Sequence, residues 1–280
     1  MGEETTWTGE RLETFVYNDN TIEHLHRYAF ALDYVKNKIV LDIASGEGYG
    51  SNLLAKYATK VYGVDIDINT INLAKEKYDA KNLEFIMGST DKIPLPDNCV
   101  DIVVSFETLE HHDKHNEMME EIQRVMKPEG ILIISTPEKK YYSDNKNYKN
   151  PFHIKELYLD EFKLLMSGYF NHTQFYFQNM FRGSLMVPEL RATEFRSYNG
   201  SYENCYKEKG YSPMYIVCIA SNKLLDMQID ISGFHGDNIE EKKLEEIIFK
   251  VRQETMIWLK KSWSYRIGNA ILAPLKFFKK

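Results

Sequence analysis

Short apolar runs alternate, along the first half of the chain, with segments whose apolar residues recur every three or four positions. The runs lie near 39–43, 61–65, 83–87, 101–105 and 131–135. The intervening segments lie near 21–35, 50–58, 68–79 and 116–126. The runs predict strands and the three-to-four spacing predicts amphipathic helices. Strands and helices that alternate with short links predict a parallel sheet with helices on both faces.

The pattern is less regular after residue 138. A helix is predicted near 155–167, and two further strands near 169–178 and 214–220. The stretch 179–212 has no clear period and is interpreted as an insertion beside the site. The last two strands would form a hairpin-like edge. We therefore predict an α/β fold with a seven-stranded Rossmann-like sheet, helices on both faces and a C-terminal helical extension.

The C-terminal segment differs in composition from the rest. Residues 224–238 are interpreted as a linker, and 238–263 has one apolar side, which predicts a long amphipathic helix. Residues 260–280 carry a charge of +6. Because the net charge of the whole chain is −6, the rest of the chain carries −12. A basic tail with aromatic residues is typical of a helix on a membrane surface or a partner. For 239–259, the alternatives are packing on its own domain or in a homodimer.

Composition limits the class of protein. With 280 residues, 43% of them hydrophobic and 27% charged, the chain is typical of one folded domain with appendages. A net charge of −6 gives no support for nucleic-acid binding. Three cysteines without metal-site spacing favour a reducing compartment. The polar N-terminus differs from a signal peptide and no apolar run approaches a membrane span, so we expect a cytoplasmic protein.

Residues 38–65 read KIVLDIASGEGYGSNLLAKYATKVYGVD, a strand, a glycine turn, a helix and a strand that ends in Asp65. This order is typical of a nucleotide-binding half-unit, in which such an acid accepts hydrogen bonds from the ribose hydroxyls. The dinucleotide pattern G-x-G-x-x-G is absent, because Ser51 stands at its third glycine and Gly50 comes one residue early. Glu47 inside the loop would repel a pyrophosphate. The loop therefore favours a cationic nucleoside such as S-adenosylmethionine.

Five blocks resemble, in order, those of class I S-adenosylmethionine-dependent methyltransferases. They are DIASGEGYG, VYGVDI, NLEFIMGSTDKIPLPD, VDIVVSFETLEH and VMKPEGILIISTP. The likeness covers about residues 36–138. Ser89 follows Gly88 where the family usually has an aspartate, so the adenine contact falls to Ser89 or Asp91. The resemblance implies S-adenosylmethionine as cofactor and, as its binding residues, Asp42, Ala44, Gly46, Glu47, Gly48, Asp65, Ile66, Ser89, Thr90, Asp91 and Phe106.

Polar residues after the fourth predicted strand are candidates for a catalytic base. Methyl transfer to a hydroxyl needs a base near the carboxyl end of that strand. His111 is the first candidate because histidine titrates near neutral pH, with Glu110 or Asp113 orienting it. Alternatively, Glu110 and His111 are a structural element beside the cofactor. Three histidines and two acids crowd this segment, which makes a metal site the lesser alternative, but His111 and His112 point different ways, so no metal ligands are assigned.

His153, in NPFHIKEL, is the second catalytic candidate. Its segment follows the fifth strand by a short loop with Tyr141 and Tyr142. In the resembled fold this loop covers the acceptor pocket, and aromatic residues beside polar ones are typical of a sugar site. The alternative is that His153 caps the next helix or packs against the domain.

Looser similarities at the ends of the chain suggest the acceptor. TGERLETFVYNDNTIEHLHRYAFA and NPFHIKEL resemble bacterial methyltransferases of cell-surface polysaccharide synthesis, including O-antigen and capsule enzymes. SWSYRIGNAILAPLKFF resembles the end of glycosyltransferases in the same pathways. The resemblance implies O-methylation of a sugar hydroxyl, on a nucleotide sugar or a lipid-linked glycan. The rivals are a methyltransferase for a small lipophilic acceptor such as a quinone, and a non-catalytic methyltransferase-like docking module.

These similarities divide the chain into three parts. Residues 1–37 are predicted to form a lid, in which Arg27 reaches the methionine carboxylate or the acceptor. Residues 38–223 form the methyltransferase domain. Residues 224–280 form a helical extension, whose basic tail contacts a glycosyltransferase or the inner face of the membrane.

Overall fold

The computed structural model describes residues 12, 14–181, 183–189, 198–200, 205–207, 213–224, 231–263 and 267. The chain divides into two compact units, residues 1–236 and 237–280. The main sheet of the first unit is built from β1 (Ile39–Ile43), β2 (Lys60–Asp65), β3 (Leu83–Met87), β4 (Val100–Phe106), β5 (Met126–Pro137), β6 (His172–Phe181), β7 (Gly183–Pro188), β10 (Tyr215–Ser221) and β11 (Ser232–Phe234). A separate ribbon pairs β8 (Tyr198–Gly200) with β9 (Cys205–Lys207).

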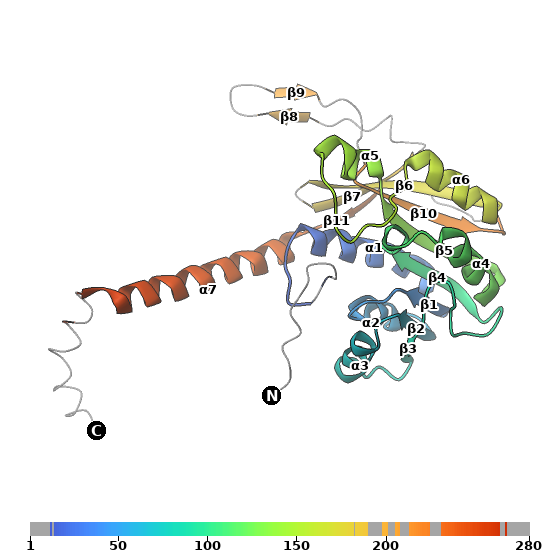
Figure 1. Ribbon diagram of the computed structural model, residues 1–280, viewed down its shortest axis with the longest axis horizontal. Coiled ribbons are helices and arrows are strands. Elements are labelled where there is room, and N and C mark those ends of the chain that lie inside the picture. The colour runs from blue at the N-terminus through green and yellow to red at the C-terminus, as the bar shows by residue number, and fades with distance from the viewer. Residues whose placement is uncertain are drawn as a thin grey trace. The chain divides into compact units, whose positions relative to one another are not determined.

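The helices of the first unit fall close to the predicted ranges. They are α1 (Asp19–Val35), α2 (Tyr49–Ala55), α3 (Ile68–Lys77), α4 (His115–Val125), α5 (Lys139–Tyr142) and α6 (Leu159–Tyr169), with the 3₁₀ turns η1 (Leu109–His111) and η2 (Asp144–Lys146). The strand order across the sheet is β11-β7-β6-β10-β5-β4-β1-β2-β3 (Figure 1).

The predicted parallel half of the sheet is confirmed. β3, β2, β1, β4 and β5 pair in parallel, so their carboxyl ends meet at one edge. β4 is buried along almost its whole length, as expected of a strand covered on both faces. The sheet therefore brings the ends of β1, β2 and β4 together, where open α/β sheets bind ligands.

The other half of the sheet is larger than predicted. It has nine strands instead of seven, because β7 lies in the stretch interpreted as an insertion and β11 in the predicted linker. β10 runs antiparallel between β5 and β6, and β7 and β11 extend the sheet beyond β6. Short strands such as β11 depend on pairing with a distant segment, which a local sequence pattern does not contain.

Helices cover both faces of the sheet, as predicted. One apolar cluster joins the sheet to α4 and α6 through residues such as Met118, Ile122 and Phe162. The opposite cluster joins it to α1 and α2 through Ala31, Val35 and Leu54. These two layers fix the strand ends and hence the positions of the polar residues that follow them.

α1, predicted to be part of a lid, is a packed helix of the core. Asn18 caps its N-terminus by accepting from the Thr21 amide at 3.1 Å, and the Thr21 hydroxyl accepts from the Asn18 amide at 3.1 Å. Ile22, Ala31 and Val35 are almost completely buried. The remaining part of the predicted lid, residues 1–11 and 13, lies outside the described residues.

The second unit contains α7 (Asp237–Lys261), where the amphipathic pattern predicts a helix. Most of the basic tail, residues 264–266 and 268–280, lies outside the described residues, so its proposed docking role stays a prediction. Within the described ranges, no helix has the length and apolar character needed to cross a membrane.

Candidate functional site

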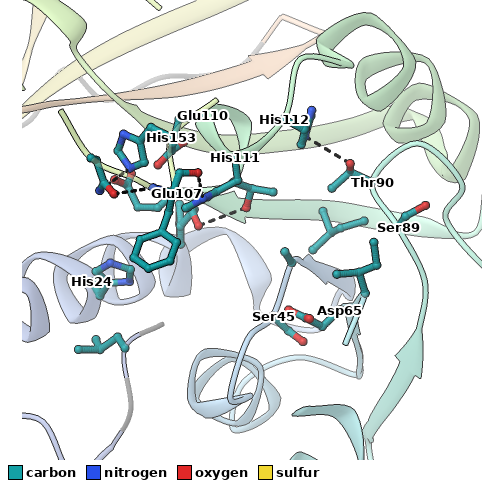
Figure 2. Close-up of a pocket in the computed structure, with 18 of the residues that line it drawn as sticks. His24, Ser45, Asp65, Ser89, Thr90, Glu107, Glu110, His111, His112 and His153 are labelled. Carbon is teal, nitrogen blue, oxygen red and sulfur yellow. Dashed lines mark hydrogen bonds between the residues drawn. The ribbon is translucent and has the colours of Figure 1, made fainter. Parts of the chain in front are cut away.

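A cavity of about 590 Å³ lies at the carboxyl ends of β1, β2 and β4 (Figure 2). One part of its wall consists of the loops after β1, β2 and β3, and includes Ser45, Asp65 and Ser89. Another part consists of η1 and the segment 142–153 after β5. His24 and Tyr28 of α1 also line the cavity. The predicted cofactor loops and the predicted acceptor loop therefore share one cavity.

Asp65 lines the cavity at the end of β2 and is held by the backbone. Its carboxylate accepts from the Gly46 amide at 2.9 Å and from the Asp67 amide at 3.0 Å. These bonds fix the carboxylate and tie the glycine loop to β2. Ile66 beside it also lines the cavity and is 68% exposed. It therefore offers an apolar surface next to the Asp65 carboxylate.

Asp42, predicted to bind the cofactor, lies beneath the cavity and is not part of its wall. It is buried, and accepts from the Ser51 hydroxyl at 2.6 Å and the Tyr28 hydroxyl at 3.2 Å. Burial raises the pKa of this carboxyl to about 6, although both hydrogen bonds oppose the rise. Asp42 therefore positions α1 and α2, because Tyr28 belongs to α1 and Ser51 to α2.

The glycine loop supports the cavity mainly through its shape. Gly46 and Gly48 have φ values of 53° and 89°, and a Cβ on Gly50 would come within 1.9 Å of the Tyr28 ring. Gly46 and Gly48 do not line the cavity directly, whereas Ala44 does. The predicted glycines thus shape the loop, and its neighbours form the wall.

Glu47 also lies outside the wall of the cavity, and its charge is paired. Its carboxylate forms an ion pair with Lys77 and accepts from the Thr14 hydroxyl at 3.0 Å. The charge that was expected to select against a pyrophosphate is therefore neutralised by a partner on α3.

Ser89, Thr90 and Asp91, which follow β3 and are predicted to bind the cofactor, all line the cavity. Asp91 is paired with Lys114, and the hydrogen bond from that ammonium group lowers its pKa to about 2. The Ser89 hydroxyl donates to the same carboxylate. Phe106, at the end of β4, also lines the wall. Ser89 and Asp91 both remain candidates for the adenine contact.

Arg27, predicted to reach the cofactor or acceptor, is fully buried and does not line the cavity. Its guanidinium donates to the Gln178 side-chain oxygen at 2.8 Å and lies 4.8 Å from the centre of the Tyr215 ring. It also lies 3.8 Å from the carboxylate of Glu107. Since Tyr215 and Glu107 do line the cavity, Arg27 acts as a support behind the wall.

Glu107 is a cavity residue that was not among the predicted site residues, although it belongs to the polar segment after the fourth predicted strand. It has a φ of 54°, which is rare for a residue with a side chain and recurs at functional sites. The Ser135 hydroxyl donates to its carboxylate at 2.6 Å. Its place directly after β4 is the only local signal. Tyr215 and Asn150 carry no such signal, because they reach the cavity from distant segments.

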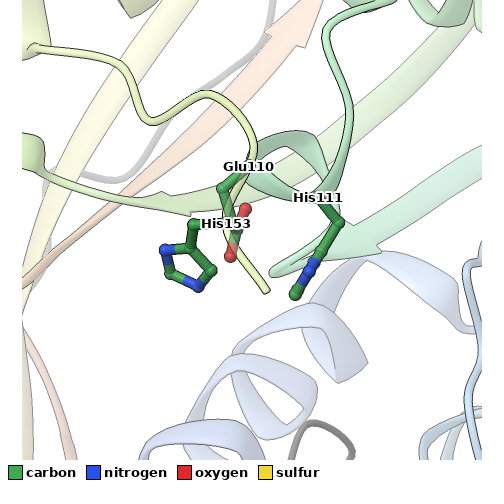
Figure 3. Close-up of side chains that lie close together, drawn as sticks. All are labelled: Glu110, His111 and His153. Carbon is green, nitrogen blue, oxygen red and sulfur yellow. The ribbon is translucent and has the colours of Figure 1, made fainter. Parts of the chain in front are cut away.

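The three predicted catalytic residues, Glu110, His111 and His153, lie together (Figure 3). One side-chain nitrogen or oxygen of each lies within 4.8 Å of the others. The rings of His111 and His153 have their centres 5.3 Å apart, nearly perpendicular. Glu110 is buried, and burial together with the nearby charge of Glu107 holds its pKa well above the usual range. We call these residues the polar triad.

Hydrogen bonds orient both imidazoles of the polar triad. Nδ1 of His111 donates to the Phe152 carbonyl at 3.1 Å. Nδ1 of His153 donates to the Glu156 carboxylate at 2.5 Å, and its Nε2 accepts from the Asn150 amide nitrogen at 3.0 Å. In His153 the proton therefore sits on Nδ1 and Nε2 carries the lone pair, and a neutral His111 ring that donates from Nδ1 has its lone pair on Nε2 as well.

Glu23 on α1 is expected to make the stability of the protein pH-dependent. Burial raises the pKa of its carboxyl from 4.5 to about 7, with Arg27 and Tyr215 opposing the rise and Glu107 and Asp19 adding to it. The folded protein holds this proton more tightly than the unfolded chain. The stabilisation is therefore complete below about pH 4.5 and is lost as the pH rises to 7.

Glu23→Gln should remove this loss. Urea unfolding at pH 8 should find the variant more stable than wild type by about 2–3 kcal/mol, and by much less at pH 5. Asp19→Asn, an exposed carboxyl on the same helix, is the matched control and should show no such difference. An equal effect of Glu23→Gln at both pH values would contradict the titration of this group.

Comparison with known proteins identifies the kind of domain. Residues 41–134 match the family model of a methyltransferase domain. A probable S-adenosylmethionine-dependent methyltransferase of Mycolicibacterium smegmatis is 36% identical over 119 residues, which are 42% of this chain and 46% of the relative. A fatty-acid O-methyltransferase of the same organism is 28% identical over 126 residues, 44% of this chain and 46% of the relative.

The chain spans less than half the length of these curated relatives. Among solved structures, the YcgJ protein from Bacillus subtilis superposes with a TM-score of 0.53 at 16% identity, over 71% of this chain and all of that one. This likeness shows the fold. The matched segment is similar to methyltransferase domains, and it contains the ends of β1, β2 and β4 that form the cavity.

Proposed function

We propose that this chain is an S-adenosylmethionine-dependent O-methyltransferase whose acceptor is a sugar hydroxyl. The sugar would belong to a nucleotide sugar or a lipid-linked glycan of cell-surface polysaccharide synthesis. The observation that carries the proposal is the character of the wall after β5. Tyr142 and Tyr148 of that segment, with Tyr215 of β10, contribute aromatic rings to the cavity, beside Asn150 and the polar triad. Aromatic faces beside oriented polar groups suit a ring that is apolar on its faces and hydroxylated at its edge.

The other wall fits the donor. S-adenosylmethionine supplies a methyl group on a sulfonium sulfur. The Asp65 carboxylate is fixed by two backbone amides, which supports a role in binding the ribose hydroxyls. Ile66 and Phe106 offer apolar contacts for the adenine, with Ser89 or Asp91 at its edge. Ala44, and the loop shaped by Gly46 and Gly48, would border the rest of the cofactor.

The polar triad would activate the acceptor. A sugar hydroxyl is a poor nucleophile until it loses its proton, and Glu110, His111 and His153 are the polar residues gathered beside the aromatic wall. Holding donor and acceptor in line contributes the remainder of the rate.

A lipid acceptor is the second candidate, because two relatives have names that point to lipids. One is the fatty-acid O-methyltransferase, and the other is a phthiotriol/phenolphthiotriol dimycocerosates methyltransferase of Mycobacterium ulcerans, 25% identical over 118 residues, 41% of this chain and 43% of that one. A fatty chain would require a mainly apolar wall. The carboxylates of Glu107 and Glu110 and the imidazoles in this wall favour the sugar.

Release of S-adenosylhomocysteine tests the proposal. The full chain is incubated with S-adenosylmethionine and, in separate reactions, nucleotide sugars, an undecaprenyl-linked glycan, a fatty acid and a quinone. We expect release with a sugar acceptor and a methyl ether on the sugar by mass spectrometry. Release only with the fatty acid or the quinone would overturn the sugar assignment, and binding of the cofactor without release in any reaction would favour a docking module.

A further inference from the structure

We propose that the polar triad, Glu110, His111 and His153, binds one divalent transition-metal ion. Glu110 and His111 come from η1, and His153 comes from the loop before α6, 42 positions later in the sequence. Figure 3 shows the three side chains converging from these two segments. The binding of the ion can be tested by itself, whereas its part in the reaction rests on the proposed function.

Both imidazoles are held through Nδ1, as the histidines of metal sites usually are. A ligating histidine typically donates its second ring N–H to a carboxylate or a backbone carbonyl, which fixes its tautomer and ring plane. His111 does this with the Phe152 carbonyl and His153 with the Glu156 carboxylate. His153 thus carries its lone pair on Nε2, and a neutral His111 ring does the same. The side chains of His153 and Glu156 are both buried, which keeps this pair in place.

The two ligand segments are joined by their backbones. The Glu110 carbonyl accepts from the Ile154 amide at 2.8 Å and from the Lys155 amide at 3.1 Å. The bond from His111 to the Phe152 carbonyl crosses the same gap. Rigidly connected ligands lose little entropy when an ion binds, so the triad is preorganised.

Glu110 completes the ligand set. Its carboxyl is 1% exposed and accepts from the Thr136 hydroxyl at a long 3.3 Å. A buried carboxylate is normally paired or coordinates a metal. Two imidazoles and one carboxylate suit Mn²⁺, Fe²⁺, Co²⁺ or Zn²⁺ better than Mg²⁺ or Ca²⁺, which prefer oxygen ligands.

Asn150 occupies a position at which it would compete with the ion. Its amide nitrogen donates to Nε2 of His153 at 3.0 Å, and this is the lone pair the metal would take. The amide must therefore turn away when the ion binds. Removal of the Asn150 side chain should therefore strengthen the binding of the ion, whereas removal of a ligand should weaken it.

Three protein ligands leave coordination positions open for the acceptor. An acceptor hydroxyl bound to the ion loses its proton to water more readily, as metal-bound water does. The oxygen then forms a bond to the methyl carbon while the carbon–sulfur bond breaks, and S-adenosylhomocysteine leaves as a neutral thioether. Under this scheme the histidines hold the ion and are not themselves the base.

Titration of the metal-stripped full chain with Mn²⁺, followed by calorimetry and electron paramagnetic resonance, tests the site. We expect one ion per chain, at least tenfold weaker binding for His111→Ala and His153→Ala, and tighter binding for Asn150→Ala. His112→Ala is the matched control, since His112 lines the same cavity but belongs to no triad and bonds the Thr90 hydroxyl at 3.3 Å. Binding of S-adenosylhomocysteine verifies that each variant is folded.

The outcomes separate this proposal from the proposed function. Absence of Mn²⁺ binding by wild type, or equal binding by wild type and His153→Ala, would overturn the metal site. Undiminished methyl transfer to a sugar by metal-stripped protein in a chelator would leave the proposed function standing and remove the metal from it. Mn²⁺ binding at the triad, without transfer to any sugar, would support the metal site and count against the sugar acceptor.

Discussion

His111→Ala is expected to lower the rate of methyl transfer by about 10²–10⁴-fold and to leave the binding of S-adenosylmethionine nearly unchanged. His111 lines the part of the cavity formed by η1 and the segment 142–153, and its ring is oriented by the Phe152 carbonyl. Removal of the imidazole takes away activation of the acceptor hydroxyl, whether the ring accepts the proton or holds an ion. Asp65 and the loops after β1 and β3, which would hold the donor, remain intact.

Single-turnover kinetics measure the rate of methyl transfer, and calorimetry with S-adenosylhomocysteine measures the affinity for the cofactor. His172→Ala is the matched control, because His172 lies on β6, outside the cavity wall. The double variant His111→Ala/His153→Ala should be only slightly slower than either single variant, since groups that act as a unit are not additive. Full turnover in His111→Ala, or equal losses of rate and cofactor affinity, would contradict a role in activation.

Asp65→Ala should weaken the binding of S-adenosylmethionine and S-adenosylhomocysteine by about 10–100-fold. Hydrogen bonds to a charged group contribute about 1.5–3 kcal/mol, and 1.4 kcal/mol is a factor of ten in affinity. The loss has two sources. The carboxylate can no longer accept from the ribose, and the Gly46 amide loses the acceptor that ties the glycine loop to β2.

Calorimetry with S-adenosylhomocysteine checks this prediction. Asp67→Ala removes the same charge two positions later, where the carboxylate accepts from the Asn69 amide at 2.9 Å and caps α3 outside the cavity wall. Its affinity should stay within a few-fold of wild type. If Asp65→Ala bound as tightly as wild type, or if Asp67→Ala were equally weak, the ribose assignment would be wrong.

The parts of the fold that the sequence predicted correctly depend on short-range patterns. The five parallel strands carry apolar runs, and the helices between them have apolar residues every three or four positions, so each element is visible in its own residues. β7 and β11 were missed because one was hidden in an aromatic, charged stretch and the other has three residues. Their pairing partners lie elsewhere in the chain, and no local pattern reports them.

The N-terminal block that contains α1 has a role in packing that the sequence did not indicate. His26 hydrogen-bonds the hydroxyls of Ser184 on β7, at 2.8 Å, and Ser232 on β11, at 3.1 Å. Burial lowers the pKa of this histidine to about 4, so it is neutral at physiological pH. The block therefore connects α1 to the two strands that the sequence did not predict, while His24 and Tyr28 reach the cavity.

The sequence by itself determined the parallel half of the sheet, the glycine turn and the acid at the end of β2, because these depend on residues close together in the chain. It also indicated which polar residues follow β4 and β5. Only the tertiary structure decided that Asp42, Glu47 and Arg27 stand behind the wall of the cavity, since burial and ion pairing depend on which distant segments pack against them. The meeting of His153 with Glu110 and His111 has the same cause, because the fold brings the loop before α6 back to η1 and holds it there by backbone hydrogen bonds.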